Sequence, residues 1–287
     1  MIMGEGQREP RQRPPAPEPL PSPVTDTHCH LDIARGPDRS WAGPEDALAE
    51  AAAVNVTRVV QIGCDPPGVK WAVTAARRFA AVVAGVAVHP NEAPRLAARG
   101  QLDEALTEID RLAGSDERVR AVGETGLDHF RTGPDGHRVQ EESFRAHIEM
   151  ARRHGKALVI HDRDAHADVL RILDDEPLPD RVVFHCFSGD ADMATHCARR
   201  GWFVSFAGSV TFANAGSLRR ALAETPLESV LVETDAPFLT PHPHRGKPNA
   251  SYLVPLTVRT MAAVLEQDLE VMCAALQTNS DATFGSW

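Results

Sequence analysis

The sequence lacks the features that mark several common classes of protein. Its five cysteines are scattered through 287 residues and form no C-x-x-C pair, which argues against a disulfide-stabilised secreted domain. No apolar run approaches the length of a transmembrane helix, and the N-terminal residues show no basic-then-apolar pattern of a signal peptide. We therefore expect reduced thiols, a cytoplasmic location and no association with a membrane.

Positive charge is also scarce in this chain. There are 30 basic and 40 acidic residues, so the formal net charge is -10 with histidine taken as neutral. A protein that holds long nucleic acid by neutralising many phosphates should instead be basic. This balance argues against a nucleic-acid-binding module, and any contact with a polyanion must be local.

The composition divides the chain into a short N-terminal stretch and one large domain. Seven prolines fall between Pro10 and Pro23, mixed with charged residues, and nothing there can form an apolar face. We therefore expect residues 1–23 to be a disordered, proline-rich tail. Residues 24–287 are sufficient for a single core, since 43% of the whole chain is hydrophobic.

From Val24 onward, short β-branched or apolar runs alternate with longer amphipathic ones. The pattern predicts strands at 24–31, 57–63, 82–88, 119–123, 157–160, 182–187, 202–206 and 230–233. It predicts helices at 44–54, 68–80, 102–112, 138–154, 164–173, 191–200, 252–265 and 269–278. Eight alternating units favour an α/β fold, a (β/α)8 TIM-type barrel in a single domain. A doubly wound open sheet is the rival, but no G-x-G-x-x-G follows the first strand.

The first expected strand carries the pattern V-T-D-T-H-C-H-L-D over residues 24–32. Side chains alternate faces along a strand, so His28 and His30 point the same way while Cys29 points away. Two imidazoles on one face can bind one divalent metal ion. Paired histidines are also common on exposed strands, so this motif predicts a metal site only if further ligands follow.

Further ligand-type residues stand at the ends of other expected strands, where a barrel would direct them into one pocket. A single histidine there is usually structural, and a single acidic residue is usually a helix cap. Such an explanation is improbable for so many positions at once, namely His28, His30, Glu124, His161, His185 and Asp235, with His89 after the third strand. We expect most of the remaining histidines to be solvated, with three as pocket-rim candidates (His129, His242 and His244), the others being His137, His147, His154, His166 and His196.

These residues can be arranged around two divalent metal ions. In this hypothesis Glu124 bridges the ions with one oxygen on each, and the two together hold a bridging hydroxide. The ligands are nitrogen and oxygen atoms, which are compatible with Mg, Mn or Zn. One site would comprise His28, His30 and Asp235, and the other His161 and His185.

The same residues suggest catalytic and substrate-binding roles. Asp235 is expected to orient or deprotonate the attacking water, and Glu124 acts through the metals that it bridges. His89 is free to contact a phosphate oxygen or to protonate the leaving group. Arg245 and Lys247 follow the last strand in a proline- and glycine-rich loop, which suits a clamp on a phosphate group.

The motifs together resemble those of the TatD-type metal-dependent deoxyribonucleases, a branch of the amidohydrolase superfamily. The matching stretches are D-T-H-C-H-L-D, V-G-E-T-G-L-D, V-I-H-D-R-D, H-C-F-S-G and E-T-D-A-P-F-L-T-P, in this order along the chain. The resemblance implies a barrel that hydrolyses phosphodiester bonds with divalent metal, commonly as a 3′–5′ exonuclease on single-stranded DNA. The ligand positions of the family correspond to His28, His30, Glu124, His161, His185 and Asp235, with His89 as a further active-site residue.

Two alternatives to the nuclease remain open. The first is a metal-dependent hydrolase of an amide, ester or lactone bond in a small molecule. Many such relatives bridge their metals with a carboxylated lysine at the fourth strand, whereas this chain has Glu124 there and Lys156 before the fifth strand. The second is a metal-binding scaffold without catalysis. For the nuclease we expect single-stranded DNA ends as substrate, no obligate protein partner and a monomer.

Overall fold

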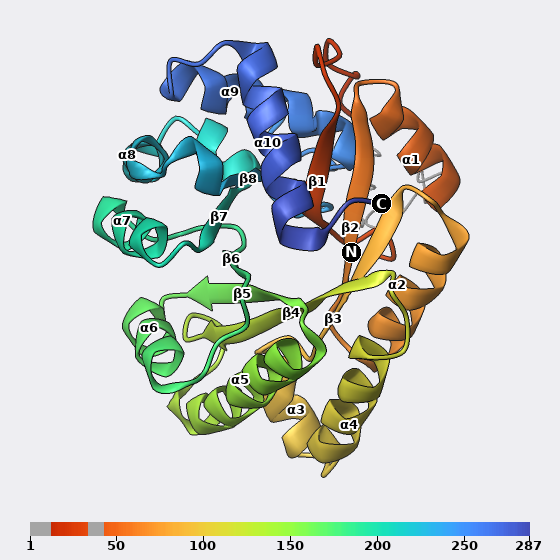
Figure 1. The fold of residues 1–287 in the computed structure, drawn as a ribbon, viewed down its shortest axis with the longest axis vertical. Coiled ribbons are helices and arrows are strands. Elements are labelled where there is room, and N and C mark those ends of the chain that lie inside the picture. The colour runs from red at the N-terminus through yellow and green to blue at the C-terminus, as the bar shows by residue number, and fades with distance from the viewer. Residues whose placement is uncertain (1–12, 34–42) are drawn as a thin grey trace, which may run out of the picture.

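Within residues 13–33 and 43–287, which the computed structural model describes, eight parallel strands form a nearly closed barrel (Figure 1). Each strand pairs in parallel with the next in the chain, from β1 to β8. The expected (β/α)8 architecture is therefore confirmed. The strands are β1 (Val24–Cys29), β2 (Val56–Gly63), β3 (Val82–Val86), β4 (Val119–Asp128), β5 (Ala157–Arg163), β6 (Val182–Phe184), β7 (Phe203–Phe206) and β8 (Val230–Val232).

Helices surround the strands, as Figure 1 shows. None of the helices in the described ranges combines the length and apolar character that a bilayer crossing requires. The α-helices are α1 (Pro44–Ala52), α2 (Pro66–Arg78), α3 (Ala93–Ala97), α4 (Leu102–Ala113), α5 (Pro134–His154), α6 (His166–Asp175), α7 (Ala191–Arg199), α8 (Gly216–Glu224), α9 (Val254–Val264) and α10 (Leu269–Phe284). Short 3-10 helices are η1 (Gly208–Thr211), η2 (Leu227–Ser229) and η3 (Ser251–Leu253).

Local signals in the sequence account for several helix ends. Asp65, Asp190 and Asp268 precede α2, α7 and α10, and each carboxylate accepts a hydrogen bond from a backbone N–H of the first turn. Such N-caps satisfy donors that would otherwise lack a partner. The longest helix, α5, ends at Gly155, which has a φ of 60° that favours glycine.

The barrel has separate inner and outer cores. Alternate strand residues point inward and form one buried cluster, while their neighbours pack against the surrounding helices in a larger cluster. The inner cluster consists of Val60, Ile62, Val83, Ala121, Ala157, Val159, Val183, Leu231 and Phe284. Because Phe284 belongs to α10, the C-terminal helix supplies a plug to the barrel interior.

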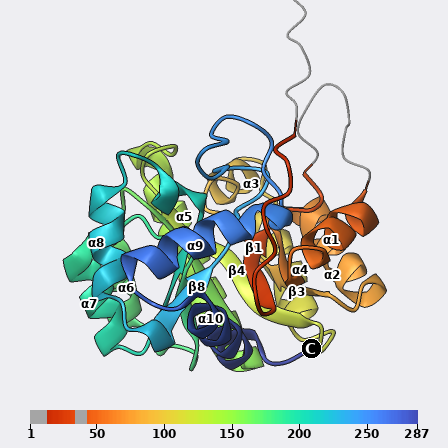
Figure 2. The ribbon, with the colours of Figure 1, turned by 90° about the horizontal axis from the view of Figure 1, so that it is seen from above.

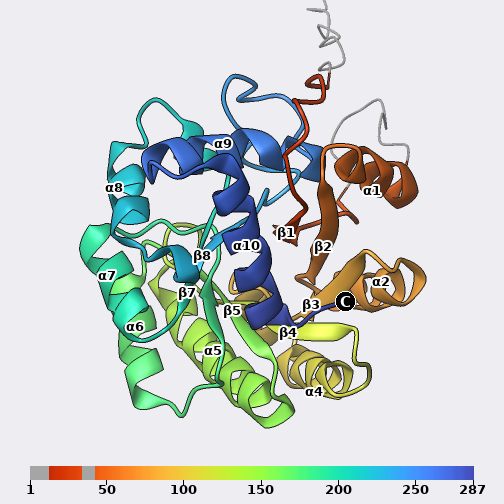
Figure 3. The same ribbon diagram turned by 45° about the horizontal axis from the view of Figure 1, so that its top comes forward.

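The C-terminal helix α10 lies at one end of the barrel and leaves the other end uncovered. At one end, α10 lies between β8 and β1 (Figure 3), and the indole of Trp287 donates a hydrogen bond of 3.2 Å to the Ala81 carbonyl before β3. Figure 2 shows α10 at this end and α3 with the loop after β8 at the other. The strands' carboxyl ends, where the expected ligands lie, are therefore at the end that α10 leaves uncovered.

Three details differ from the sequence-based expectation. Strand β4 continues to Asp128, because residues 125–128 stay paired with residues 160–163 of β5. Helix α8 lies between β7 and β8, where no helix was expected, and α3 is a further short helix after β3. Both are short, and a brief amphipathic run gives little periodicity to detect.

Residues 13–23 also differ from the expected disordered tail. They form no regular element, yet Leu20 is only 2% exposed and its backbone N–H donates a hydrogen bond of 3.2 Å to Val54. The Tyr252 hydroxyl donates to the Pro14 carbonyl at 2.7 Å. Leu20 is an apolar anchor that the surrounding prolines obscure in the sequence. The remainder of the expected tail, residues 1–12, lies outside the described residues.

His147 in α5 is fully buried, contrary to the expectation of a solvated side chain. Its Nε2 accepts a hydrogen bond of 3.0 Å from the Val88 backbone N–H, and its Nδ1 donates to the Ser143 carbonyl at 2.7 Å. Because Nε2 accepts, the ring must be neutral with its proton on Nδ1. Burial accordingly lowers the pKa of His147 to about 4.

This histidine should make the stability of the protein depend on pH. Because the pKa of about 4 in the fold lies below the ordinary 6.5, the unfolded chain binds more protons between these values. Stability should therefore rise with pH across this window and level off above it, by about 2 kcal/mol from pH 5 to 7.5. Urea unfolding with a chelator should show this contribution in the native protein and its loss in His147→Gln. Equal pH dependence of the two proteins would contradict the assignment.

Candidate metal centre

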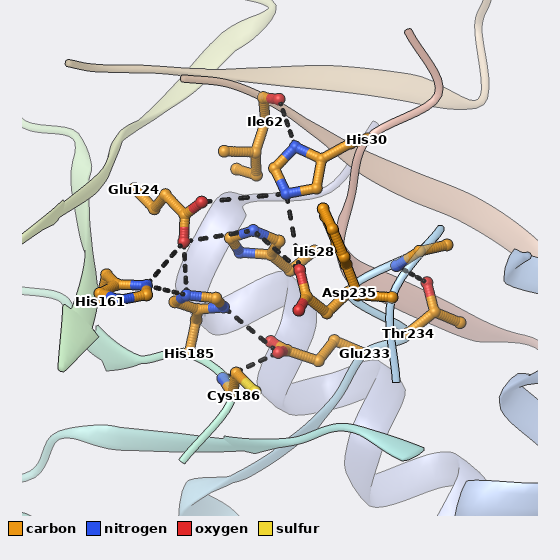
Figure 4. A network of polar contacts seen from close by, with 12 residues as sticks. His28, His30, Ile62, Glu124, His161, His185, Cys186, Glu233, Thr234 and Asp235 are labelled. Carbon is orange, nitrogen blue, oxygen red and sulfur yellow. Dashed lines mark hydrogen bonds and ion pairs between the residues drawn. The ribbon is translucent and has the colours of Figure 1, made fainter. Parts of the chain in front are cut away.

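The six side chains that were predicted as metal ligands meet at the carboxyl end of the barrel (Figure 4). His28 lies within β1, and Glu124 and His161 lie in β4 and β5. The others follow strands: His30 comes directly after β1, His185 directly after β6 and Asp235 three residues after the end of β8. His28 is fully buried and Glu124 is 4% exposed. The barrel thus concentrates nitrogen and oxygen ligands in a nearly water-free place.

One carboxylate oxygen of Glu124 faces three histidines. Its Oε2 lies 2.5 Å from His185 Nε2, 3.3 Å from His161 Nδ1 and 3.8 Å from His28 Nε2. His161 and His185 belong to or follow the neighbouring strands β5 and β6, and His28 belongs to β1, which pairs with neither of them. Glu124 therefore occupies the centre of the cluster.

The other oxygen of Glu124 faces a second set of groups. Its Oε1 lies 3.9 Å from His30 Nε2 and 3.6 Å from His89 Nε2. Asp235 approaches the same region, with its Oδ1 3.5 Å from His30 Nε2 and 4.0 Å from His28 Nε2. His30 thus lies near one oxygen, and His161 and His185 lie near the other, which is the arrangement that a bridging carboxylate needs. His28 Nε2 lies between the two groups, 3.8 Å from Glu124 Oε2 and 4.0 Å from Asp235 Oδ1.

A second layer of acceptors holds the imidazoles in place. Ring nitrogens that do not face Glu124 approach carboxylate or carbonyl oxygens, which orient the rings and increase their basicity. The pairs are His30 Nδ1 with the Ile62 carbonyl at 3.0 Å, His161 Nε2 with Asp128 Oδ2 at 3.2 Å and His185 Nδ1 with Glu233 Oε1 at 3.3 Å.

Sequence reasoning missed Asp128, Glu233 and Cys64 as members of this centre. Glu233 is fully buried, and its Oε1 also accepts a hydrogen bond of 2.8 Å from the Cys186 N–H. Its position could have identified it, since Glu233 is the last residue of the strand predicted at 230–233, and the other ligand-type residues also stand at strand ends. Cys64 follows β2, and its Sγ lies 3.2 Å from Glu124 Oε1.

The last ligand segment is fixed to the first by backbone hydrogen bonds. The Asp235 N–H donates to the His28 carbonyl at 2.9 Å, and the His30 N–H donates to the Ala236 carbonyl at 2.8 Å. Beside them, buried Asp26 accepts hydrogen bonds from the backbone N–H and the hydroxyl of Thr234 at 2.9 and 2.6 Å. These contacts set the distance between Asp235 and the two histidines of β1.

The electrostatics of the cluster reflect its carboxylates. Burial alone would raise the pKa of Glu124, but the charge of His185 and the hydrogen bonds from His161 and His185 outweigh it and hold that pKa well below its usual range. Burial likewise opposes protonation of His30, yet the hydrogen bond to Asp235 and the charge of Glu124 raise its pKa to about 9. The carboxylates of Glu124 and Asp235 are thus stabilised by positive charge close to them, and either protons on the histidines or metal cations can supply it.

The donor set fits divalent metal ions. Both ring nitrogens of His28 are buried and have no hydrogen-bond partner among residues 13–33 and 43–287, and the same holds for Glu233 Oε2. A buried polar atom without a partner lowers the stability of the fold by about 1–3 kcal/mol, unless a ligand or an ion binds to it. His28 also belongs, with His30 and Glu124, to one of three groups of ligand atoms that lie within 4.8 Å of one another. A cation among these atoms would satisfy His28.

The predicted substrate-binding cations lie at the rim of the barrel. Arg245 and Lys247 are exposed in the loop after β8, and no hydrogen bond or ion pair joins them to the cluster among the described residues. The Arg245 guanidinium lies over the Phe212 ring, 4.4 Å from its centroid. Asn249 anchors the loop by donating a hydrogen bond of 3.0 Å to the Thr234 carbonyl. Phe187, in contrast, is buried at 3% exposure and belongs to the core.

Comparisons with known proteins agree with this geometry. The family described as "TatD related DNase" matches residues 25–285. A Mycobacterium tuberculosis protein named "Uncharacterized metal-dependent hydrolase TatD" is 42% identical over 91% of this chain and 98% of its own. The corresponding YabD protein of Bacillus subtilis is 34% identical, with 90% and 98% covered.

Solved structures show the same fold. The crystal structure of YjjV, a TatD homologue from Escherichia coli K12, superposes with a TM-score of 0.83 and 25% identity. That likeness covers 92% of this chain and 98% of the other. With the family matched along nearly the whole barrel and close relatives covered almost from end to end, this chain belongs to the TatD family of metal-dependent hydrolases, within the amidohydrolase superfamily.

Proposed function

We propose that this protein is a phosphodiesterase that removes nucleotides from the 3′ end of single-stranded DNA with the help of two divalent metal ions. The observation that carries the proposal is the position of Glu124, whose two oxygens face different ligand groups. The exonuclease activity and its 3′ polarity rest on the resemblance to the deoxyribonuclease branch of the family.

The residues divide naturally between the two ions. We assign Glu124 to both, with its Oε1 toward His30 and its Oε2 toward His161 and His185. When bound, such a pair of cations supplies an activated water and neutralises the charge that develops on a phosphoryl group. The nitrogen and oxygen ligands suit Mg, Mn or Zn. The first site takes His28, His30 and Asp235, and the second takes His161 and His185.

The chain itself must position the attacking water and accept its proton. Asp235 is suited to both tasks because it lies beside His28 and His30 and its side chain is 15% exposed, more than that of Glu124 at 6%. Its Oδ1 lies 3.5 Å from His30 Nε2, so it can hold a proton within a charged network. We therefore assign Asp235 as the general base.

The tautomer and the protonation of His89 follow from its surroundings. Its Nδ1 accepts a hydrogen bond of 3.0 Å from the Asn91 backbone N–H, so in the neutral ring the proton is on Nε2. Burial lowers the pKa of His89 to about 3, despite the opposing charge of Glu124. A neutral ring is a weak acid, which favours contact of Nε2–H with a phosphate oxygen over protonation of the leaving group.

Replacement of His89 should separate catalysis from metal binding. His89→Ala should keep its full metal content and lose turnover by about 100-fold, because one hydrogen bond to the transition state is removed. His89→Gln, which retains an N–H donor, should recover part of the rate. Metal analysis beside steady-state kinetics provides the measurement. Loss of a metal ion from His89→Ala would instead make this residue a ligand.

Two observations favour a phosphodiester over an amide or lactone substrate. The bridging position of β4 holds Glu124, while Lys156 is directed elsewhere and donates a hydrogen bond of 2.5 Å to the Val119 carbonyl at the start of β4. In a chain with a net charge of -10, Arg245 and Lys247 place positive charge locally at the rim. Such a distribution suits a few terminal phosphates better than a long duplex.

The decisive experiment is a time course on a 5′-labelled single-stranded oligonucleotide. Chelated enzyme is supplied separately with Mg, Mn or Zn, and Asp235→Asn serves as the inactive control. A ladder that shortens from the 3′ end, only with metal, is the expected result. Intact oligonucleotide with every metal, from enzyme that binds two ions, would favour the small-molecule hydrolase.

A further inference from the structure

The turn after β4 carries an exposed aromatic side chain beside the metal centre. Phe130 is 61% exposed, and among the described residues only Val271 is another large apolar residue with comparable exposure. The guanidinium carbon of Arg163, the last residue of β5, lies 4.2 Å from the centroid of the Phe130 ring. Because the cation covers one face of a ring that remains mostly exposed, the opposite face is open to solvent.

This arginine–phenylalanine pair is held rigidly by the backbone. Asp128 and Arg163 are register partners in the paired strands, and the His129 N–H donates a hydrogen bond of 3.0 Å to the Arg163 carbonyl. The Arg131 N–H donates to Asp128 Oδ1 at 2.8 Å, which fixes the turn that carries Phe130. A fixed aromatic surface can stack a planar ligand at little entropic cost.

The pair also lies close to the reacting groups. Asp128, which holds the turn, is bonded through its Oδ2 to His161 Nε2 at 3.2 Å. Arg163 stands two residues after His161 on the same strand, a separation of about 7 Å along the backbone. This is about the distance between successive phosphates in an extended single strand, for which OB-fold-type grooves use the same kinds of side chain.

The guanidinium of Arg163 stacks on an aromatic ring, as that of Arg245 stacks on Phe212. Many other arginines pair with carboxylates, whereas in the part of the chain that the structure describes no carboxylate lies within ion-pair distance of Arg163. A guanidinium stacked on an aromatic ring keeps its N–H donors at the edge, where they can bind a phosphate. An unpaired cation beside an open ring matches the two parts of a nucleotide.

We propose that Phe130 and Arg163 form a nucleotide subsite, in which Phe130 stacks the base next to the cleaved nucleotide and Arg163 binds its phosphate. The subsite rests on the proposed function and adds to it a contact outside the metal centre. It predicts that the enzyme distinguishes a strand of several nucleotides from a diester that contains only one.

The test compares two substrates that differ in this contact. One is a 5′-labelled pentadeoxyadenylate, and the other is thymidine 5′-(4-nitrophenyl phosphate), a diester with no second nucleotide. Phe130→Ala should raise KM for the pentanucleotide about 10-fold with kcat unchanged, and should leave both constants unchanged for the small diester. Phe130→Trp should restore the KM, and Arg163→Gln should raise it. Val271→Ala, on α10 at the other end of the barrel, is the matched surface control.

Three outcomes would overturn the subsite. These are an unchanged KM in Phe130→Ala, an equal loss on both substrates, or a KM that the tryptophan variant does not restore. If the wild-type enzyme cleaves neither substrate, the proposed function fails, and the subsite is then tested by fluorescence anisotropy with the labelled pentanucleotide and no metal. Weaker binding by Phe130→Ala than by Val271→Ala would support it, and equal binding would reject it.

Discussion

A Glu124→Ala variant is expected to lose both metal ions and more than about 1,000-fold in turnover, since it removes a ligand shared by two sites. The two oxygens of Glu124 lie within 4 Å of four histidine nitrogens outside the His89 contact, so no neighbouring side chain can replace them. Metal content by mass spectrometry and kinetics on the small diester together measure the effect.

The Glu124→Gln variant separates charge from shape at this position. It keeps the size of the side chain, so the fold should persist, but it removes the negative charge that the histidines surround. We expect it to retain less than one equivalent of metal and to resemble the alanine variant in activity. A full complement of two ions in Glu124→Ala would show that the bridging assignment is wrong.

An Asp235→Asn variant is expected to lose about 100- to 10,000-fold in turnover, the contribution typical of a general base. Asparagine is the suitable replacement because Asp235 has a φ of 52°, a conformation that asparagine tolerates better than alanine does. The amide should keep part of the metal affinity, since its oxygen can still coordinate. The kcat of this variant should therefore fall far more than its metal content.

Asp162 provides a matched control for this substitution. It also lies at a strand end, one residue after His161, but its Oδ2 pairs with His166 Nδ1 at 2.7 Å instead of facing the cluster. Asp162→Asn should keep both metals and its activity within a few-fold. Comparable losses in the two asparagine variants would mean that Asp235 acts only through general electrostatics.

Much of this architecture could be predicted from patterns among residues that lie close together in the sequence. Strand parity placed His28 and His30 on one face, and the strand-end positions of Glu124, His161 and Asp235 led to one pocket once a barrel was assumed. Both conclusions need only the period of a strand and the rule that barrel sites lie at the carboxyl ends. The structure brings all five together.

What could not be predicted depends on contacts between distant parts of the chain. Burial of His147 follows from its packing beneath Val88, and the anchoring of Leu20 follows from a hydrogen bond to Val54. The hydrophobic pattern of the sequence around His147 and Leu20 does not show that either residue is buried. The extension of β4 to Asp128 likewise depends on its partner strand, because the local G-E-T-G sequence is typical of a turn.

The contacts between Asp26, His28 and the segment from Thr234 to Ala236 also have a consequence for biosynthesis. Asp26 and Thr234 are 208 positions apart, and the two segments close the seam between the first and last strands. All residues up to Asp235 must therefore emerge from the ribosome before Asp235 can join the histidines of β1. The ability to bind metal should arise late in synthesis. A cation bound there would stabilise the closed barrel by linking β1 to the segment after β8.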